Sequence, residues 1–229
     1  MRRRASSQLA SMPGAPIQWD AAVRVVPKFP SIAELEQLDP ALQAAALAQL
    51  DSVSPGILGN LDLLPAGALP VGPGTAQLIM SFTFSKPARF NDRTFAAFYG
   101  GESLQTAISE TVHHTLRGLR DSAAPPQTLP PRVAMHVTVT APDGVDARGA
   151  SYTEIYQPDD YTESQLFGTL VRGRGHQGIV FRSVRRPAGE CVAIYDLPTL
   201  TNCREDRELV YRYDGGKIEV SEIHLSSGA

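Results

Sequence analysis

The sequence has few of the residues that fasten small secreted domains and no long apolar run. Its 229 residues include only two cysteines, Cys191 and Cys203, which allow a single disulfide but do not require one. The basic start, Met1 to Arg4, is followed by small and polar residues rather than by the apolar segment of a signal peptide. No window approaches the roughly 20 apolar residues that a membrane-spanning helix needs. We therefore expect a cytoplasmic protein with reduced thiols and no membrane contact.

An excess of charge of one sign is also lacking. The formal net charge is −3, too close to neutral for the usual strongly basic nucleic-acid-binding protein. The hydrophobic fraction of 42% and the charged fraction of 20% are ordinary for a globular protein with a core. The length favours one large domain, and the 19 glycines and 18 prolines indicate many loops.

Several motifs with a known chemistry are absent. There is no GxxxxGK[ST] loop, no GxGxxG and no HExxH. Neither cysteine has the paired spacing of a structural zinc site. Glu110 and His113 form one ExxH on a predicted helix, whereas a di-iron bundle needs two such helices. We therefore expect no metal, and we interpret His113 and His114 as solvated helix residues.

Helical periodicity and capping signals predict four helices. Ser31 and Glu34 form a capping box, and Asp39-Pro40 is a typical restart of a helix. In the longest helix the apolar stripe is Leu104, Ile108, Val112 and Leu119, and Glu110 lies about 100° outside it. Thr162 and Gln165 form a second capping box. The predicted helices are residues 32–38, 40–50, 103–120 and 162–172.

Alternating apolar residues predict strands that outnumber the helices. Asp214-Gly215-Gly216 is a typical hairpin turn between the last two. The predicted strands are residues 23–26, 78–84, 95–99, 132–139, 178–184, 191–196, 209–213 and 217–223. Because strands and helices do not alternate regularly, we predict an α+β fold with a mainly antiparallel sheet. We expect a flexible basic arm over residues 1–20 and one domain over 21–229, with a Gly/Pro-rich insertion at about 53–75.

Three segments carry the candidate chemistry. Pro87-Ala88-Arg89-Phe90-Asn91 is a loop between two predicted strands. Residues 98–110 are a strand, a Gly100-Gly101 break and a helix with the carboxylate of Glu110. Residues 175–184 are a glycine-flanked strand that reaches Ser183. In this order the segments resemble the RES-domain family, toxins of toxin–antitoxin pairs named for Arg, Glu and Ser. The family's usual Gly-Gly-Arg-Trp-Asn and Pro-Ser appear here as residues 87–91 and Arg182-Ser183.

The resemblance implies an ADP-ribosyltransferase-like fold, a split sheet with flanking helices, and NAD+ as substrate. It places Arg89, Glu110 and Ser183 at the catalytic positions, and it matches Arg24 to an arginine that family members often carry near their start. A guanidinium binds phosphate oxygens bidentately, which suits Arg89 and Arg24 to the pyrophosphate. Glu110 is suited to stabilise the oxocarbenium-like ribose or to hold its 2′-hydroxyl. Ser183 is suited to orient the ribose or that carboxylate, and Tyr99 to stack on the nicotinamide.

The resemblance leaves the acceptor of the ADP-ribose open among a protein, phosphate and water. A protein acceptor is slightly favoured, because the insertion at 53–75 offers a docking surface. The resemblance also implies a cognate antitoxin that blocks the active site, with nucleic acid reached only through that antitoxin. The arginine-rich run 171–186 contains no acidic residue and suits NAD phosphates, an acidic partner or nucleic acid.

The rival hypothesis is a non-enzymatic binding module that uses this arginine run for nucleic acid or an acidic protein. Taken singly, Arg89 is explained as a surface charge and Glu110 as a solvated helix residue. Ser183 and Tyr99 are equally explained as core residues. Their joint occurrence in the family's order favours the enzyme.

Overall fold

The structure is a computed structural model that describes residues 14–28, 75–83, 86–149 and 153–224. The helices predicted at 32–38 and 40–50 lie outside the described residues, as does the insertion predicted at 53–75 apart from its last residue. None of the described helices is long and apolar enough to cross a membrane.

The described strands form one eight-stranded sheet in which β4 and β5 are the one parallel pair. The order is β1-β2-β6-β5-β4-β7-β3, with β8 on β7 and a further pairing of β1 with β4. This confirms the mainly antiparallel sheet of a mixed fold. The strands are β1 (Gly14–Pro27), β2 (Phe98–Gly101), β3 (Gln127–Thr128), β4 (Arg132–Asp146), β5 (Gly178–Arg182), β6 (Glu190–Ile194), β7 (Leu200–Tyr213) and β8 (Ile218–His224).

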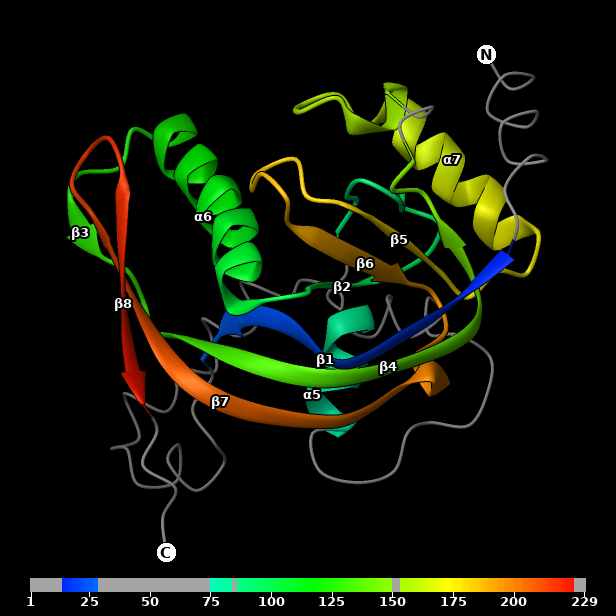
Figure 1. The fold of residues 1–229 in the computed structure, drawn as a ribbon. Helices are drawn as coiled ribbons and strands as arrows, with labels where there is room; N and C mark the ends of the chain where they lie inside the picture. Colours follow the sequence, from blue (N-terminus) through cyan, green and yellow to red (C-terminus); the bar gives the residue numbers. More distant parts are fainter. Residues whose placement is uncertain (1–13, 29–74, 84–85, 150–152, 225–229) are drawn as a thin grey trace, which may run out of the picture.

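Three α-helices pack against different parts of this sheet (Figure 1). The helix α6 (Leu104–Asp121) packs on β1, and α7 (Thr162–Gly173) packs on β5 and on the short helix η2 (Glu154–Tyr156). The helix α5 (Thr75–Thr83) packs against β2, β7 and the short helix η3 (Leu197–Thr199). The two longer helices therefore cover separate regions of the sheet, α6 beside the long strands and α7 beside β5.

The strands β1, β2, β6, β5 and β4 form a closed circuit. Strand β1 pairs with β4 along most of its length but meets β2 at the single pair Val23↔Gly101. The parallel contact of β4 with β5 spans only residues 144–146. Apolar side chains from all five strands are buried together in one core cluster: Ile17, Phe98, Met135, Val180 and Ile194. Beyond Val23, β1 separates from β2, and this separation matters for the site.

The helix α6 begins where the sequence predicts. Ser103 is its N-cap, and the Ser103 Oγ accepts a hydrogen bond of 3.2 Å from the Thr106 backbone N–H. The Glu102 carboxylate accepts hydrogen bonds from the Thr106 hydroxyl (2.7 Å) and the Glu190 backbone N–H (2.8 Å). A Cβ on Gly101 would come within 3.0 Å of the Ala107 nitrogen, so only glycine lets α6 start this close to β2. The sequence predicted that Gly100-Gly101 ends the strand, whereas both glycines belong to β2.

Three further sequence predictions of structure are wrong. Residues 78–83 belong to the helix α5 rather than to a strand, because Leu78 and Phe82, four apart, are the buried pair. Residue 84 of the predicted strand lies outside the described residues. Residues 14–20 of the predicted arm belong to β1, where Gly14 pairs with Val145 and Trp19 with Val139. The capping box predicted at Thr162 is also not formed, since Asp160 Oδ1 accepts the Thr162 N–H instead.

The helix α7 touches the loop of residues 86–91 backbone to backbone. A Cβ on Gly168 would lie 2.0 Å from the Phe90 carbonyl oxygen. The Gln165 side chain donates a hydrogen bond of 3.0 Å to the Ala88 carbonyl oxygen. The helix α7 therefore fixes the position of the loop that carries Arg89.

We predict that Gly168→Ala lowers the free energy of unfolding by about 1–3 kcal/mol or more, because the methyl group overlaps backbone that cannot rotate away. Chemical denaturation measures this. The matched control is Gly173→Ala in the same helix, where a Cβ meets nothing within 4 Å. That control should be neutral or slightly stabilising, since alanine is the better helix former. Equal effects of the two substitutions would contradict the close approach.

Candidate active site

A cavity of about 700 Å³ lies between α6, the separating strands β1 and β2, and the loop of residues 86–89. Tyr161 closes another part of its wall. One face of α6 lines the cavity over roughly 16 Å, given the helical rise of about 1.5 Å per residue. The residues of that face are Ala107, Glu110, Thr111, His114, Thr115 and Gly118. The face that the sequence predicted to point away from the core therefore faces this cavity.

Glu110 and Ser183 are in direct contact. The Ser183 Oγ donates a hydrogen bond of 2.7 Å to Glu110 Oε1. The same Oγ accepts hydrogen bonds from the backbone N–H groups of Arg185 (3.1 Å) and Arg186 (3.0 Å). A hydroxyl has one proton and two lone pairs, so these two acceptances leave the proton for the carboxylate. Ser183 does not line the cavity itself, and it acts on the cavity by fixing Glu110.

Arg89 lines the cavity opposite α6 and is only 7% exposed. Its Nη1 donates hydrogen bonds of 2.9 Å to the carbonyl oxygens of Ile155 and Gln157. The ring of Tyr161 lies 4.8 Å from its guanidinium carbon. Burial lowers the pKa of Arg89, and Tyr161 and Glu110 oppose this shift. No carboxylate in the described part of the chain forms an ion pair with Arg89.

Tyr99 holds the loop that carries Arg89. Its hydroxyl accepts a hydrogen bond from the Phe90 backbone N–H (2.9 Å) and donates one to Asn91 Oδ1 (2.8 Å). The Asn91 amide in turn donates to the carbonyl oxygens of Lys86 and Phe95. Burial raises the pKa of Tyr99 well above its usual range. Tyr99 lines the cavity, but its hydroxyl is occupied within the protein.

Arg24 also reaches the cavity, from the gap between β1 and β2. Val23 and Val25 pack under α6, so Arg24 between them points to the opposite face of β1, over the ring of Phe98. Its Nη1 donates a hydrogen bond of 3.1 Å to the Tyr99 carbonyl oxygen. Burial lowers the pKa of Arg24 to about 10, which leaves it charged at neutral pH.

The structure thus brings the five predicted site residues together. Arg24, Arg89, Tyr99 and Glu110 line one cavity, and Ser183 contacts it through Glu110. The alternative interpretation of Arg89 as a surface charge is wrong, because the side chain is buried.

Sequence reasoning missed several other residues of the cavity wall. Cys191 lies 3.9 Å from Glu110 Oε1, and burial raises the pKa of its thiol. His114 follows Glu110 by one helical turn and lines the cavity, where desolvation lowers its pKa and Glu110 opposes that shift. Arg132 and Tyr161 come from distant segments, and no local pattern marks them. The spacing of Glu110 and His114 on one helix face was the one available signal.

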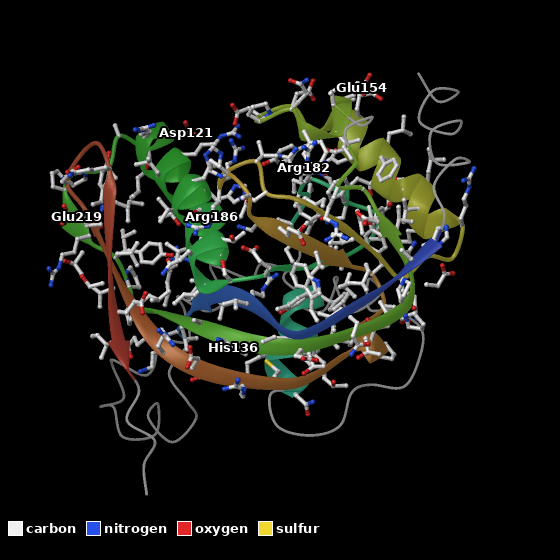
Figure 2. The ribbon with its side chains drawn as sticks, in the orientation of Figure 1. Asp121, His136, Glu154, Arg182, Arg186 and Glu219 are labelled. Carbon is white, nitrogen blue, oxygen red and sulfur yellow. The ribbon has the colours of Figure 1, made fainter. Side chains whose placement is uncertain are left out.

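The arginine-rich run does not form one surface. Arg172 and Arg174 lie at the end of α7, whereas Arg182 ends β5 and is followed by the turn with Arg185 and Arg186. Figure 2 labels Arg182, the last residue of β5, and Arg186, which lies within that turn. Arg185 is engaged within the protein, with hydrogen bonds to the Pro158 carbonyl oxygen and to Asp159. Only the part of the run at the β5–β6 turn is therefore close to Ser183.

A comparison with protein-family models matches the RES domain over residues 73–214, more than half of the chain. The chain belongs to the RES domain family. No curated protein matches it. Among solved structures it is similar to a chain of the MbcT–MbcA toxin–antitoxin complex of M. tuberculosis, at 12% identity and a TM-score of 0.44. That likeness covers 91% of this chain and 90% of the other, and it is too remote to carry an argument about this RES domain.

We predict that Tyr99→Phe destabilises the RES domain by about 1–3 kcal/mol, because the Phe90 N–H and the Asn91 oxygen both lose their partner. Urea denaturation gives the free energy of unfolding. Tyr161→Phe is the matched control: its ring stays over Arg89, and its hydroxyl makes no hydrogen bond to the described residues. The control should change stability by less than about 0.5 kcal/mol. A Tyr99→Phe protein as stable as the control would show that the loop does not depend on this hydroxyl.

Proposed function

We propose that this chain is the toxin of a toxin–antitoxin pair that cleaves the nicotinamide–ribose bond of NAD+ and transfers ADP-ribose to an acceptor. The observation that carries the proposal is one cavity lined by Arg89 and Glu110, with Ser183 fixing the carboxylate. Its volume of about 700 Å³ falls within the range of about 300–1,000 Å³ typical of ligand pockets. Membership of the RES family supports the same reading.

The charge of the cavity suits an anionic dinucleotide. Three arginines and Lys86 line it, against the single carboxylate of Glu110. Arg89 and Arg24 each use one nitrogen to bond a backbone carbonyl group, which fixes the guanidinium while other N–H groups stay available. A fixed guanidinium binds phosphate oxygens with little further loss of side-chain entropy. We assign the pyrophosphate of NAD+ to Arg89 and Arg24.

The chemistry assigned to Glu110 follows from the reaction. When the bond between the nicotinamide nitrogen and C1′ breaks, its electron pair leaves with nicotinamide and positive charge develops on the ribose. A carboxylate at that position stabilises the charge or holds the 2′-hydroxyl. The Ser183 hydroxyl keeps the carboxylate in one orientation, so it does not reorganise during the reaction. Ser183 is a positioning residue in this mechanism, and the ring of Tyr99 is assigned to the nicotinamide.

The separation of β1 from β2 beyond Val23 supports an ADP-ribosyltransferase-like split sheet as the finer fold assignment. We retain a protein as the slightly favoured acceptor, which makes the enzyme a mono-ADP-ribosyltransferase. Phosphate and water are the alternatives, and they make the enzyme an NAD+ phosphorylase or a glycohydrolase. The rival binding module has no use for a carboxylate inside a cationic cavity, since Glu110 weakens the attraction of a polyanion.

We predict that Glu110→Gln reduces nicotinamide release from NAD+ by on the order of 10²-fold or more, because the charge-stabilising group is lost. Release is measured on the purified full chain by chromatography, together with the melting temperature. Glu219→Gln is the matched control: Glu219 is 69% exposed on β8 and does not line the cavity. Its turnover should equal that of the wild type. Near-wild-type turnover by Glu110→Gln would remove Glu110 from the mechanism.

The same assay identifies the acceptor. With labelled NAD+, a protein acceptor retains the label in precipitated protein. Phosphate gives a phosphorylated ADP-ribose only when phosphate is supplied, and water gives free ADP-ribose in every buffer. If no nicotinamide is released with a protein, phosphate or water as acceptor, the enzymatic function is contradicted and the binding module is favoured.

We further predict that expression of the chain without its partner arrests growth and that Glu110→Gln removes the arrest, because NAD+ turnover in the cell would then stop. Colony counts after induction measure this, with Glu219→Gln as the control that still arrests growth. The adjacent gene should encode a small antitoxin that co-purifies and suppresses nicotinamide release by blocking the cavity. Harmless high-level expression of the wild-type chain alone would contradict the toxin.

A further inference from the structure

Arg132, at the start of β4, lines the same cavity but belongs to none of the segments that identify the family. Its Nη2 donates a hydrogen bond of 3.1 Å to the Thr115 hydroxyl on α6. Its guanidinium carbon lies 5.0 Å from the centre of the Tyr211 ring. The group therefore lies over an aromatic ring and is oriented by a hydroxyl.

This guanidinium is not neutralised by the protein. Arg132 forms no ion pair with any carboxylate in the described residues, unlike Arg148 and Arg207, which each contact two. Its Nε is buried and has no acceptor among the described residues, and its one hydrogen bond goes to a neutral hydroxyl. Burial lowers the pKa of Arg132. A desolvated cation without a counter-ion is unfavourable, and an anionic ligand in the cavity would offset that cost.

The position of Arg132 separates it from the groups assigned to the dinucleotide pyrophosphate. Its partner Thr115 follows Glu110 by five residues, which is roughly 7.5 Å along α6. Arg24 contacts Tyr99, on the strand that precedes the other end of the same helix. The donors of the Arg132 end therefore serve a different part of a ligand or a second ligand.

We propose that Arg132 and Thr115 form an oxyanion subsite for a phosphoryl group, distinct from the position of the pyrophosphate at Arg89 and Arg24. The guanidinium N–H groups of Arg132 and the Thr115 hydroxyl, whose proton is not used in its bond with Arg132, supply donors from two directions to a phosphoryl group. The group is either free inorganic phosphate or the 2′-phosphate of a phosphorylated dinucleotide. The subsite deepens the proposed function, since it rests on a dinucleotide occupying the rest of the cavity.

Phosphate alone tests the subsite without any turnover. The melting temperature of the full chain is followed against phosphate concentration, with sodium chloride at matched ionic strength as the reference. Wild type should be stabilised by phosphate beyond the salt reference. Arg132→Gln should weaken the apparent phosphate affinity roughly tenfold or more, through the loss of charge-assisted hydrogen bonds. Arg117→Gln, an exposed arginine on α6 outside the cavity, should respond as wild type does.

Two results overturn the subsite: no phosphate effect on the wild type, or an equal effect on Arg132→Gln and wild type. If Arg132→Gln fails to fold, Thr115→Val replaces it, because this variant keeps the charge and removes only the hydroxyl that orients it. Thr115→Val should also bind phosphate more weakly. An unchanged affinity in that variant would equally overturn the proposal.

Calorimetry in the Glu110→Gln background separates the two sources of the phosphoryl group. For free phosphate, NAD+ and NADP+ bind equally and phosphate binds together with NAD+. For a 2′-phosphate, NADP+ binds more tightly than NAD+, phosphate competes with it, and Arg132→Gln removes the preference. Failure of the proposed function would appear separately, as wild type that binds phosphate through Arg132 but releases no nicotinamide.

Discussion

The burial of Arg89 is the constraint on which the arrangement of the site depends. A guanidinium that is 7% exposed needs acceptors, and the chain supplies two backbone carbonyl groups, those of Ile155 within η2 and of Gln157 directly after it. That segment lies near α7, and α7 in turn presses on the Arg89 loop at Gly168. Tyr99 and Asn91 hold the loop from the side of β2. The packing of α7, η2 and β2 thus converges on one cation, and its free N–H groups are left facing the cavity.

A second level of order comes from the turn between β5 and β6. The Ser183 hydroxyl has both lone pairs occupied by backbone N–H groups, so its proton is directed at Glu110. The same turn is tied to the start of α6, because Glu102 bonds the backbone of Glu190. Two contacts therefore determine the position of Glu110. Glu102 fixes where α6 begins, and Ser183 fixes the direction of the Glu110 carboxylate.

Sequence patterns predicted the elements whose contacts are local. The helix α6 and the hairpin at Asp214 appear where expected, because a cap and a turn specified them. The alternating strand β4 begins at Arg132 as expected but runs on to Asp146, beyond the predicted end at residue 139. Residues 78–83 were misjudged because both periods fit so short an apolar run, and packing of Leu78 and Phe82 against the core decides for the helix. Strand β1 extends back to Gly14 because β4 provides a partner, which no local signal reports.

The residues of the candidate site also fall into two groups: those that the sequence identified and those that only tertiary packing brings to the cavity. Arg89, Glu110 and Ser183 were assigned by family resemblance, and the resemblance alone made their meeting in space foreseeable. Arg132 and Tyr161 reach the cavity through tertiary packing, and neither lies in one of the three segments that carry the family resemblance. Asn91 lies in the candidate segment of residues 87–91, yet its role in holding the loop depends on Tyr99, eight residues away.

In the proposed function, the excess of positive charge in the cavity links substrate binding to inhibition. Several cations that share one carboxylate repel one another, and an anion that binds in the cavity lowers this repulsion and stabilises the fold. A dinucleotide supplies phosphates, and an antitoxin that blocks the cavity would supply carboxylates to the same guanidinium groups. Both ligands then draw on one set of N–H donors. In the proposed function, substrate and antitoxin therefore compete directly for these groups.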